Sequence, residues 1–564
     1  MNPRSLLQKL LLVLLLLPTL ALGAERVGDF SLLDQDGYFH QMSWYDDNQA
    51  IVLLVQASGD AAAQDVLADF DSLKSSFESQ DIELFMINPL GLKDRDAVKA
   101  ELAVRHIDVP VLMDDARLIS EALGIDKIGE VLVYNPKSFT VMFRGPVGEE
   151  LTTALTDIVA GRDLQTIEVA STGTAVSFPI KAAHQQQAPS YEKEIGPIIA
   201  QNCATCHRAG GIAPFALDSH TMVMGWSQMI REVLMTKRMP PGQIDPQIGH
   251  FINDMVLADA DAQKIVHWIE AGSPKDGDSD PLTEWAFGEP DYVIEIPEQS
   301  IPATGVLDYY NVMVELDLEE DRWVRASQYI PGDHTVLHHT LHSLIAPGAT
   351  RGGSLLGGEP DRPNIAPYIP GQAPRMEPPN TGGLLKAGTR IAMQMHYTTT
   401  GKESVDASRI GLWFYPEGFV PEERMSGQCA CHFTPTWVNI PPQDPDYEMT
   451  QSFTIEKDAK LFAFTPHMHF RGKRMRFFAD YPDGSSEELI NIANYNYNWQ
   501  LAYTYEEPKF VPAGTVITAT GAFDNSQQNK MNPDPFRSVP WGLQSWDEMF
   551  FGAADWKYVD QGGN

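Results

Sequence analysis

The chain has 564 residues, more than a single hydrophobic core usually serves, so three or four domains are expected. Its 43% hydrophobic and 10% aromatic content excludes a disordered chain. A net charge of −35 and a pI near 4.7 exclude nucleic acid as a partner, because phosphates require cationic surfaces.

The first 23 residues read as a signal peptide. Arg4 and Lys9 carry the only charges before Glu25, and the leucine-rich residues 10–17 are too short a stretch for a membrane span. An uncleaved N-terminal anchor is the alternative. No later stretch is long and apolar enough to cross a bilayer. We therefore expect a mature protein without a stable membrane span, in the periplasm or secreted.

Residues 24–165 alternate between strand-like and helix-like patterns. Apolar runs of strand length and amphipathic stretches of helical length occur at 51–55, 65–78, 83–87, 96–104, 131–134 and 151–161. Strands that alternate with helices are typical of βαβ units, so this segment is predicted to be an α/β domain.

The same segment resembles the thioredoxin and peroxiredoxin-like family at residues 27–30, 36–37 and 109–114. The family's redox cysteine would lie near residues 58–62, but the segment contains no cysteine. Because thiol chemistry needs a thiolate, this domain cannot perform it. We interpret the segment as a degenerate thioredoxin-like domain that serves as a docking or structural module.

A change of composition separates this domain from the next. Residues 166–190 are polar with little periodicity, which is typical of a linker. Residues 191–278 have helical patterns, including an apolar stripe at Ile265, Val266 and Ile269. The sequence therefore predicts an all-α domain after the linker.

This all-α domain contains a C-x-x-C-H motif, formed by Cys203, Cys206 and His207. The two thiols can add to the vinyl groups of a haem while the histidine binds its iron, and export favours this interpretation because c-type haem is assembled outside the cytoplasm. A plain disulfide or half of a zinc site is the alternative. Met239 precedes two prolines, resembles the Met-Pro loop of small c-type cytochromes and is the expected sixth ligand, with His250 as its rival. A haem with both axial positions filled carries electrons, so we predict a cytochrome c-like electron supplier.

Residues 279–564 consist of short β-type runs punctuated by proline and glycine. Such runs occur at 293–296, 312–316, 410–414, 462–464 and 516–519. The length of the region predicts two all-β sandwich domains of the jelly-roll type, over residues 279–425 and 426–564.

The β region holds clustered histidines, namely His338, His339, His396, His467 and His469. His467 and His469 would lie on one face of a regular strand, whereas His338 and His339 can bind one metal only if their strand twists or bulges. Histidine sets without carboxylates and with a methionine suit copper that cycles between Cu(I) and Cu(II), more than non-haem iron.

In these motifs the region resembles the copper type II, ascorbate-dependent monooxygenases, the family of peptidylglycine α-hydroxylating monooxygenase and dopamine β-monooxygenase. That family binds one copper with a His-His pair and a His before Tyr, and a second copper with H-x-H and a Met after Glu. The matching residues are His338, His339 and His396 for the first copper, and His467, His469 and Met549 for the second. Gln394 matches a family glutamine and is implied in hydrogen bonding between the two sites.

The resemblance implies a mechanism and a set of cofactors. The second copper would bind oxygen and take a hydrogen atom from an aliphatic C–H, and the first would store and pass an electron. One oxygen atom would enter the product and the other would become water. The implied cofactors are two copper ions and one haem c, with the haem replacing or supplementing ascorbate as the reductant.

Two departures from the family concern the substrate. The peptide enzyme has an arginine two residues before its H-x-H motif that binds the substrate carboxylate, and Thr465 stands at that position here. Its other substrate contacts have no match around Phe551 and Ala553. A peptide C-terminus is therefore not the expected substrate, and Phe550 and Phe551 favour a small, lipophilic one.

The β region also contains three histidines and two cysteines outside these motifs. His334, His342 and His432 are assigned no metal, although His342 shares a strand face with His338 in a regular strand. Cys429 and Cys431 are either a disulfide, free thiols or a copper entry point, and the sequence leaves these open.

The leading hypothesis is thus an exported oxygen-dependent hydroxylase that takes a small-molecule substrate and O2, with a periplasmic electron donor as a further partner. The rival is a periplasmic haem and copper protein for electron transfer or copper handling, without oxygenase activity. A haem-based sensor is a third, weaker alternative, because the chain contains no signalling segment.

Overall fold

The computed structural model describes residues 26–559 except 91–94, 163–165, 209–212, 242–243, 253, 278–284, 334, 350–362, 364, 366, 369–373, 423–424 and 434. The predicted signal peptide and His334 lie outside the described residues. The chain divides into two compact units, Met1–Phe30 with His40–Ser177 and Ser31–Phe39 with Phe178–Asn564. Among the described residues, no helix combines the length and the apolar character that a membrane span requires.

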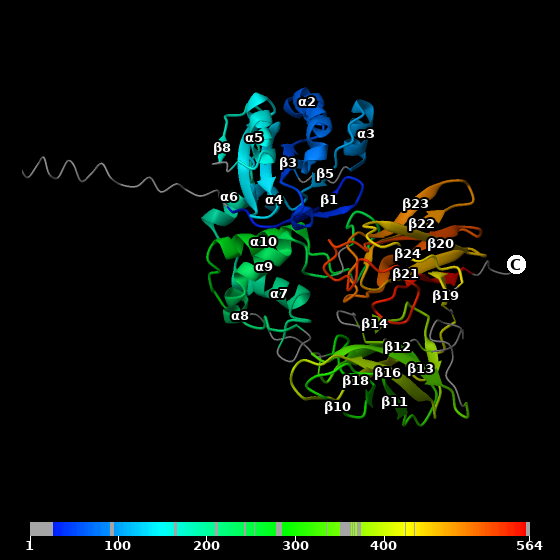
Figure 1. Ribbon diagram of the computed structural model, residues 1–564. Coiled ribbons are helices and arrows are strands. Elements are labelled where there is room, and N and C mark those ends of the chain that lie inside the picture. The colour runs from blue at the N-terminus through cyan, green and yellow to red at the C-terminus, as the bar shows by residue number, and fades with distance from the viewer. Residues whose placement is uncertain are drawn as a thin grey trace, which may run out of the picture. The chain divides into compact units, whose positions relative to one another are not determined.

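The first unit is built on a mixed β-sheet flanked by helices, in blue and cyan in Figure 1. The strands of this sheet are β1 (Ser31–Asp34), β2 (Phe39–Gln41), β3 (Ala50–Val55), β4 (Ile82–Asn88), β5 (Val111–Met113), β6 (Glu130–Asn135), β7 (Thr140–Pro146) and β8 (Ile167–Glu168). Its helices are η1 (Met42–Tyr45), α2 (Ala61–Phe77), η2 (Glu78–Gln80), α3 (Arg95–Arg105), α4 (Leu118–Ala122) and α5 (Glu149–Val159).

Strands β3, β4 and β5 are parallel and are connected through α2 and α3, so the predicted βαβ units are confirmed. Strand β6 pairs antiparallel with β3 and with β7. One core combines a face of these strands with the apolar faces of α2, α3 and α5. All six predicted elements of this segment exist, each with ends within a few residues of those expected.

Short helices follow the first unit. The described residues between 179 and 277 form no strand. The helices are α6 (Pro179–Gln186), η3 (Tyr191–Ile195), α7 (Gly196–Asn202), α8 (His220–Gly225), α9 (Ser227–Met235) and α10 (Asp259–Glu270). The predicted apolar stripe of α10 is buried in a small core with Tyr191 and Ile195.

Two expectations need refinement in this part of the chain. Residues 166–190, interpreted as a linker, carry the short strand β8 and the helix α6. The helices after them are short and enclose one small core, so their arrangement alone does not define a cytochrome domain. The feature that indicates a haem is therefore the C-x-x-C-H motif and not the arrangement of the helices.

The described residues of the first β region form ten strands in three sheets, and all the pairs are antiparallel. They are β9 (Tyr292–Glu295), β10 (Gln299–Ile301), β11 (Tyr310–Glu315), β12 (Arg322–Ile330), β13 (Leu337–Ile345), β14 (Arg375–Met376), β15 (Gly383–Leu385), β16 (Arg390–Tyr397), β17 (Ser404–Asp406) and β18 (Arg409–Phe414). The sheet β11-β16-β13 and the sheet around β12 and β18 share one buried core, which makes this region a sandwich.

The second β region is also a sandwich, of two four-stranded sheets with the orders β19-β26-β21-β24 and β20-β25-β22-β23. Its strands are β19 (Ser426–His432), β20 (Tyr447–Thr454), β21 (Ala459–His467), β22 (Gly472–Asp480), β23 (Ser486–Ile492), β24 (Tyr503–Val511), β25 (Val516–Phe523) and β26 (Phe550–Tyr558). No described sheet mixes strands of the two regions, so the change of sheet falls between Phe414 and Ser426.

Candidate metal centres

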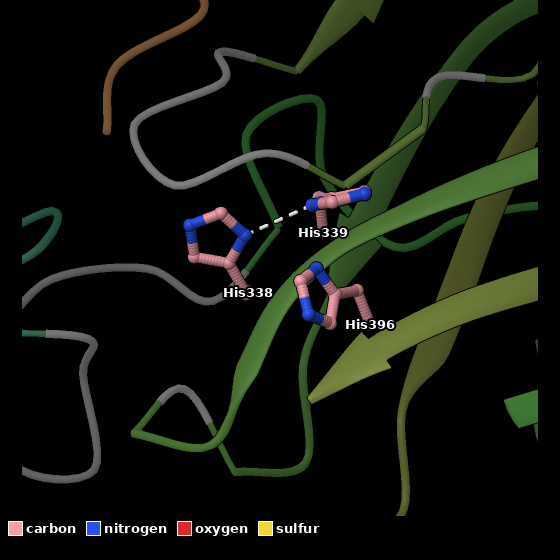
Figure 2. A group of neighbouring side chains, drawn as sticks. All are labelled: His338, His339 and His396. Carbon is pink, nitrogen blue, oxygen red and sulfur yellow. Dashed lines mark hydrogen bonds between the residues drawn. The ribbon is translucent and has the colours of Figure 1, made fainter. Parts of the chain in front are cut away.

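His338, His339 and His396 converge on one point at the edge of the first sandwich. Figure 2 shows the first two rings coming from β13 and the third from β16, all directed toward one another. One ring nitrogen from each can be chosen so that all three lie within 4.8 Å of one another. Three neutral imidazoles at this spacing fit the coordination of copper.

A β-bulge brings the two consecutive histidines together. The register between β13 and β16 shifts between Leu337 and His339, so that His339 pairs with His396 and His338 is the extra residue. A bulge turns one side chain out of the strict alternation of a strand. The Nδ1 atoms of His338 and His339 consequently lie 2.9 Å apart, and the predicted need for a bulge is met.

The nitrogen atoms of this cluster are arranged for a shared partner. The Nδ1 atom of His396 is buried and has no hydrogen-bond partner in the structure. The Nδ1 atoms of His338 and His339 contact each other, and only one of them can donate a hydrogen bond. A metal ion bound to all three atoms would satisfy them together, so the residues present fit a copper ion.

Burial keeps these imidazoles neutral. It lowers the pKa of His338 to about 4 and, with the neighbouring imidazoles adding to the effect, that of His339 to about 3. The pKa of His396 is also lowered by burial. Because a metal competes with protons for the same lone pairs, neutral imidazoles are the form that can bind a metal ion.

The stability of the copper-free protein should therefore depend on pH. Unfolded histidine takes up a proton near pH 6.5, whereas His338 and His339 do so only near pH 4 or below. Between these limits the unfolded chain binds more protons, so stability falls as the pH falls. Melting curves of the apoprotein should show a lower Tm at pH 5 than at pH 7. A His339→Phe variant should lose less over that range, and equal losses would contradict the assignment.

The second cluster, His467 and His469, lies at the end of β21. The strand ends at His467, so His469 lies just beyond it and the H-x-H motif is not wholly in a strand, contrary to the sequence expectation. The two ring centroids are nevertheless only 5.2 Å apart. Burial lowers the pKa of both, that of His469 to about 3.

Hydrogen bonds fix which nitrogen of each ring is available. The Nδ1 atom of His467 lies 2.6 Å from Oε1 of Gln500, and the Nδ1 atom of His469 lies 3.3 Å from the carbonyl oxygen of Asp547. If both Nδ1 atoms donate, both Nε2 lone pairs face away from these partners and can bind a metal. Such carbonyl partners orient metal-bound imidazoles in many proteins.

The segment that carries Met549 lies next to this pair. The Asp547 carbonyl oxygen, two residues before Met549, lies 3.3 Å from Nδ1 of His469, and Phe551, two residues after it, is opposite His467. Met549 is 7% exposed and directly precedes β26. Two imidazoles and a thioether are a donor set that suits copper in both oxidation states, so the residues present fit the group.

Glu548, next to Met549, forms hydrogen bonds with the segment that carries the H-x-H motif. Its carboxyl oxygens accept hydrogen bonds from the backbone N–H groups of His469 at 2.8 Å and Arg471 at 2.6 Å. The side chain is fully buried, and burial raises its pKa to about 8. The carboxyl group thus joins the H-x-H segment to the segment that carries Met549.

Replacing Glu548 with alanine should destabilise the protein and loosen this cluster. Two buried N–H groups would lose their acceptor, and each such loss costs ~1–3 kcal/mol. We expect a loss of about 3 kcal/mol in the free energy of unfolding, measured by urea denaturation. Glu548→Gln, which keeps an acceptor oxygen, should lose clearly less. Equal losses in the two variants would show that these hydrogen bonds do not contribute to the free energy of unfolding.

A single tyrosine ring contacts both clusters. The Tyr497 ring stacks on His338 at 5.7 Å between centroids and meets His469 edge-on at 5.8 Å. Its hydroxyl group lies 2.6 Å from the hydroxyl group of Ser545. The clusters of the two sandwiches are therefore separated by the width of one aromatic side chain.

The other histidine on β13 and the predicted glutamine lie apart from these contacts. His342 is opposite the buried Met393, and its Nε2 atom lies 2.8 Å from the Thr340 hydroxyl group. It lies three positions after His339 in the regular part of the strand, and therefore on the other face of β13. Gln394 shares a face of β16 with His396, and its hydrogen-bonding role between the sites stays a prediction.

The C-x-x-C-H residues follow helix α7 directly. Cys203 and Cys206 are not joined in a disulfide, and burial raises the pKa of Cys203 to about 12 and also raises that of Cys206. The Nδ1 atom of His207 lies 3.2 Å from the Phe215 carbonyl oxygen, which leaves Nε2 for an iron. The Phe215 ring stacks on Trp226 at 4.0 Å, so the surroundings are apolar. Two free thiols, an oriented imidazole and apolar walls fit a haem c.

The two candidate sixth ligands differ in exposure. Met239 follows α9 and is half-buried, with its backbone N–H bonded to the Val233 carbonyl oxygen. His250 is exposed, and its carbonyl oxygen accepts a hydrogen bond from Glu506. The choice of Met239 as a ligand therefore stays a prediction.

Sequence reasoning missed three side chains of these centres, namely Tyr497, Gln500 and Glu548. Two of them belong to the run of aromatic and amide residues at 494–500, whose composition is unusual for a surface loop. That composition is the signal that could have drawn attention to the segment. Glu548 precedes Met549 in the Glu-Met motif, and the sequence gives it no role of its own.

Comparison with known proteins adds little about these centres. No protein-family model and no curated protein matches the chain. Similar solved structures include a hypothetical protein from Sinorhizobium meliloti, with 17% identity over 27% of this chain and 93% of that one and a TM-score of 0.25. Peroxidoxin BcpB from Mycobacterium tuberculosis has 18% identity over 25% and 98%, with a TM-score of 0.22. A thiol-disulfide oxidoreductase from Bacteroides fragilis has 17% identity over 24% and 99%, also with a TM-score of 0.22.

Each of these matches covers about a quarter of the chain. By their names, two of them are thiol-redox proteins. Residues 24–165 of this chain contain no cysteine.

Proposed function

We propose that the protein is an exported copper-dependent monooxygenase that hydroxylates an aliphatic C–H of a small, lipophilic substrate. The observation that carries the proposal is the Tyr497 ring, which contacts a cluster of three histidines on one side and the H-x-H pair on the other. Hydroxylation of a C–H by O2 consumes two electrons and two protons besides the substrate. Two adjacent one-electron centres suit that stoichiometry.

The chain's own residues have separable roles in this proposal. His338, His339 and His396 would hold the electron-transfer copper, and the second site of His467, His469 and Met549 would hold the catalytic one. Copper bound at the second site would supply the oxygen chemistry. Because burial keeps the imidazoles of both sites neutral, their lone pairs are available at neutral pH. Gln500 and Asp547 would hold the two rings of the H-x-H pair in one tautomer.

The surroundings of the second site favour an apolar substrate. The Phe551 ring stacks on His467 with 5.6 Å between centroids, and Phe433 lies 5.1 Å from Phe551. Thr465 lies on the same face of β21 as His467, where it offers a hydroxyl group and no positive charge. This lining suits a hydrocarbon surface and gives a substrate carboxylate no cationic partner.

The unpaired, buried thiols of Cys203 and Cys206 and the oriented ring of His207 support the binding of a haem c, which would deliver electrons in place of or together with ascorbate.

The test begins with metal analysis of the purified full-length protein and a pyridine haemochrome spectrum. We expect about two coppers and one c-type haem per chain. Oxygen uptake by the reduced, copper-loaded protein should then rise when a panel of apolar C–H substrates is added. Full metal loading without substrate-dependent uptake would favour the electron-transfer or copper-handling alternative. Haem without copper, even after copper loading, would exclude the monooxygenase.

A further inference from the structure

Cys429 and Cys431 form a pair on one face of β19. Their Sγ atoms are bonded to each other, and their Cα atoms are 5.2 Å apart. Ala430 between them is fully buried and faces the core of the sandwich, so both cysteines point to the opposite face. Both are half-buried, and β19 is the outer strand of its four-stranded sheet. The pair is thus accessible from one side of the sheet.

The same face carries the second candidate copper site. Cys431 is opposite Phe551 on β26, and Phe551 is opposite His467 on β21, so the three residues form one row across three strands. The ring contact between Phe551 and His467 confirms that their side chains share a face. Neighbouring strands are spaced about 4.8 Å apart, which places the cysteine pair ~10 Å from His467 along the row.

We propose that the reduced Cys429 and Cys431 pair is a third metal site, which binds one Cu(I) ion and transfers it to the H-x-H site. Two thiolates are soft ligands that select Cu(I), and two residues on one strand face can bind the same ion. Imidazoles with a thioether, two strands away along the same row, accept the ion in either oxidation state. The thiolate site does not depend on the proposed function, whereas the transfer rests on copper binding at His467 and His469.

The pair must be reduced before it can bind the ion. A dithiol reductant would exchange with the disulfide: it is oxidised to its own disulfide, and its two hydrogen atoms end on the Sγ atoms of Cys429 and Cys431. Binding of Cu(I) would then release both as protons. The oxidised pair has no thiolate and cannot bind the ion, so the redox state of the pair would control its entry.

The test counts Cu(I) ions on the full-length haem-loaded protein. Protein reduced with a phosphine and freed of it under anaerobic conditions is titrated with Cu(I) in competition with bicinchoninate. Untreated protein and the C429S/C431S double variant serve as controls. We expect one more Cu(I) per chain in the reduced wild type than in either control, with sulfur ligation in X-ray absorption spectra. Equal counts in all three would overturn the site.

Two further arms separate this site from the proposed function. His467→Ala should lose copper at the H-x-H site and keep the extra thiolate-bound ion; loss of both would overturn the thiolate site as an independent one. When Cu(I) is added to reduced apoprotein, the H-x-H site should fill at least tenfold faster in the wild type than in C429S/C431S. Equal filling rates would overturn the transfer. Neither arm requires a known substrate.

Discussion

Replacing His467 with alanine is expected to abolish substrate-dependent oxygen uptake while the haem and the first copper remain bound. His467 is half-buried, and its ring contacts the rings of His469 and Phe551. A two-ligand remnant of His469 and Met549 would hold copper weakly and in the wrong geometry. Metal ions contribute several kcal/mol to such reactions, so we expect a loss of ~10³-fold or more in turnover.

The matched control is His432→Ala, which removes an imidazole from the same sandwich. His432 lies on β19, and its Nε2 atom is hydrogen-bonded to the Thr450 carbonyl oxygen, away from the candidate ligands. This variant should keep two coppers per chain and its activity. Copper analysis, haem absorbance and oxygen uptake on both variants check the prediction. A His467→Ala protein with two coppers and full activity would mean that oxygen reacts elsewhere.

The strands and helices could be predicted because their signals are local. The apolar runs of β3, β4 and β6 lie in a sheet buried on both faces, and their length identified them. The alternation along β16 exposes one side of the strand and buries Met393, Met395 and Tyr397 on the other. Neither feature needs knowledge of a distant residue.

The geometry of the sites could be predicted only in part. The need for a bulge at His338 follows from strand periodicity, but its existence depends on the register with β16, about 60 residues later. The end of β21 at His467 was not foreseen. There the chain turns toward Glu548, whose buried carboxyl group binds the N–H groups of His469 and Arg471. Such a long-range hydrogen bond has no local sequence signal.

The least predictable residue was Tyr497, because its role comes from the meeting of two sandwiches. Its local pattern is that of a polar and aromatic loop between β23 and β24. Only the structure brings its ring against His338 and His469. Residues of this kind have no metal-ligand chemistry of their own, so a search for ligand motifs passes over them.

Tyr497→Ala is expected to keep both coppers and to slow the transfer of electrons between them. The side chain is 7% exposed, and its ring occupies the space between the two clusters. Removing it leaves a cavity and frees two ligand rings from their packing, and loss of such supporting contacts typically costs 10–100-fold in activity. We expect a fall of that order, about 10- to 100-fold, in turnover, with a smaller change in copper content.

The matched variant is Tyr497→Phe, which keeps the ring and loses only the hydroxyl contact with Ser545. If electron transfer between the two coppers depends on the packing of the ring, the phenylalanine variant should retain most of the turnover and the alanine variant should not. Rapid mixing of the fully reduced proteins with O2 would separate the two copper oxidations in time. Simultaneous oxidation of both coppers in Tyr497→Ala, at the wild-type rate, would show that electrons cross by another route. A loss of activity in Tyr497→Phe equal to that in Tyr497→Ala would assign the coupling to the hydroxyl group instead.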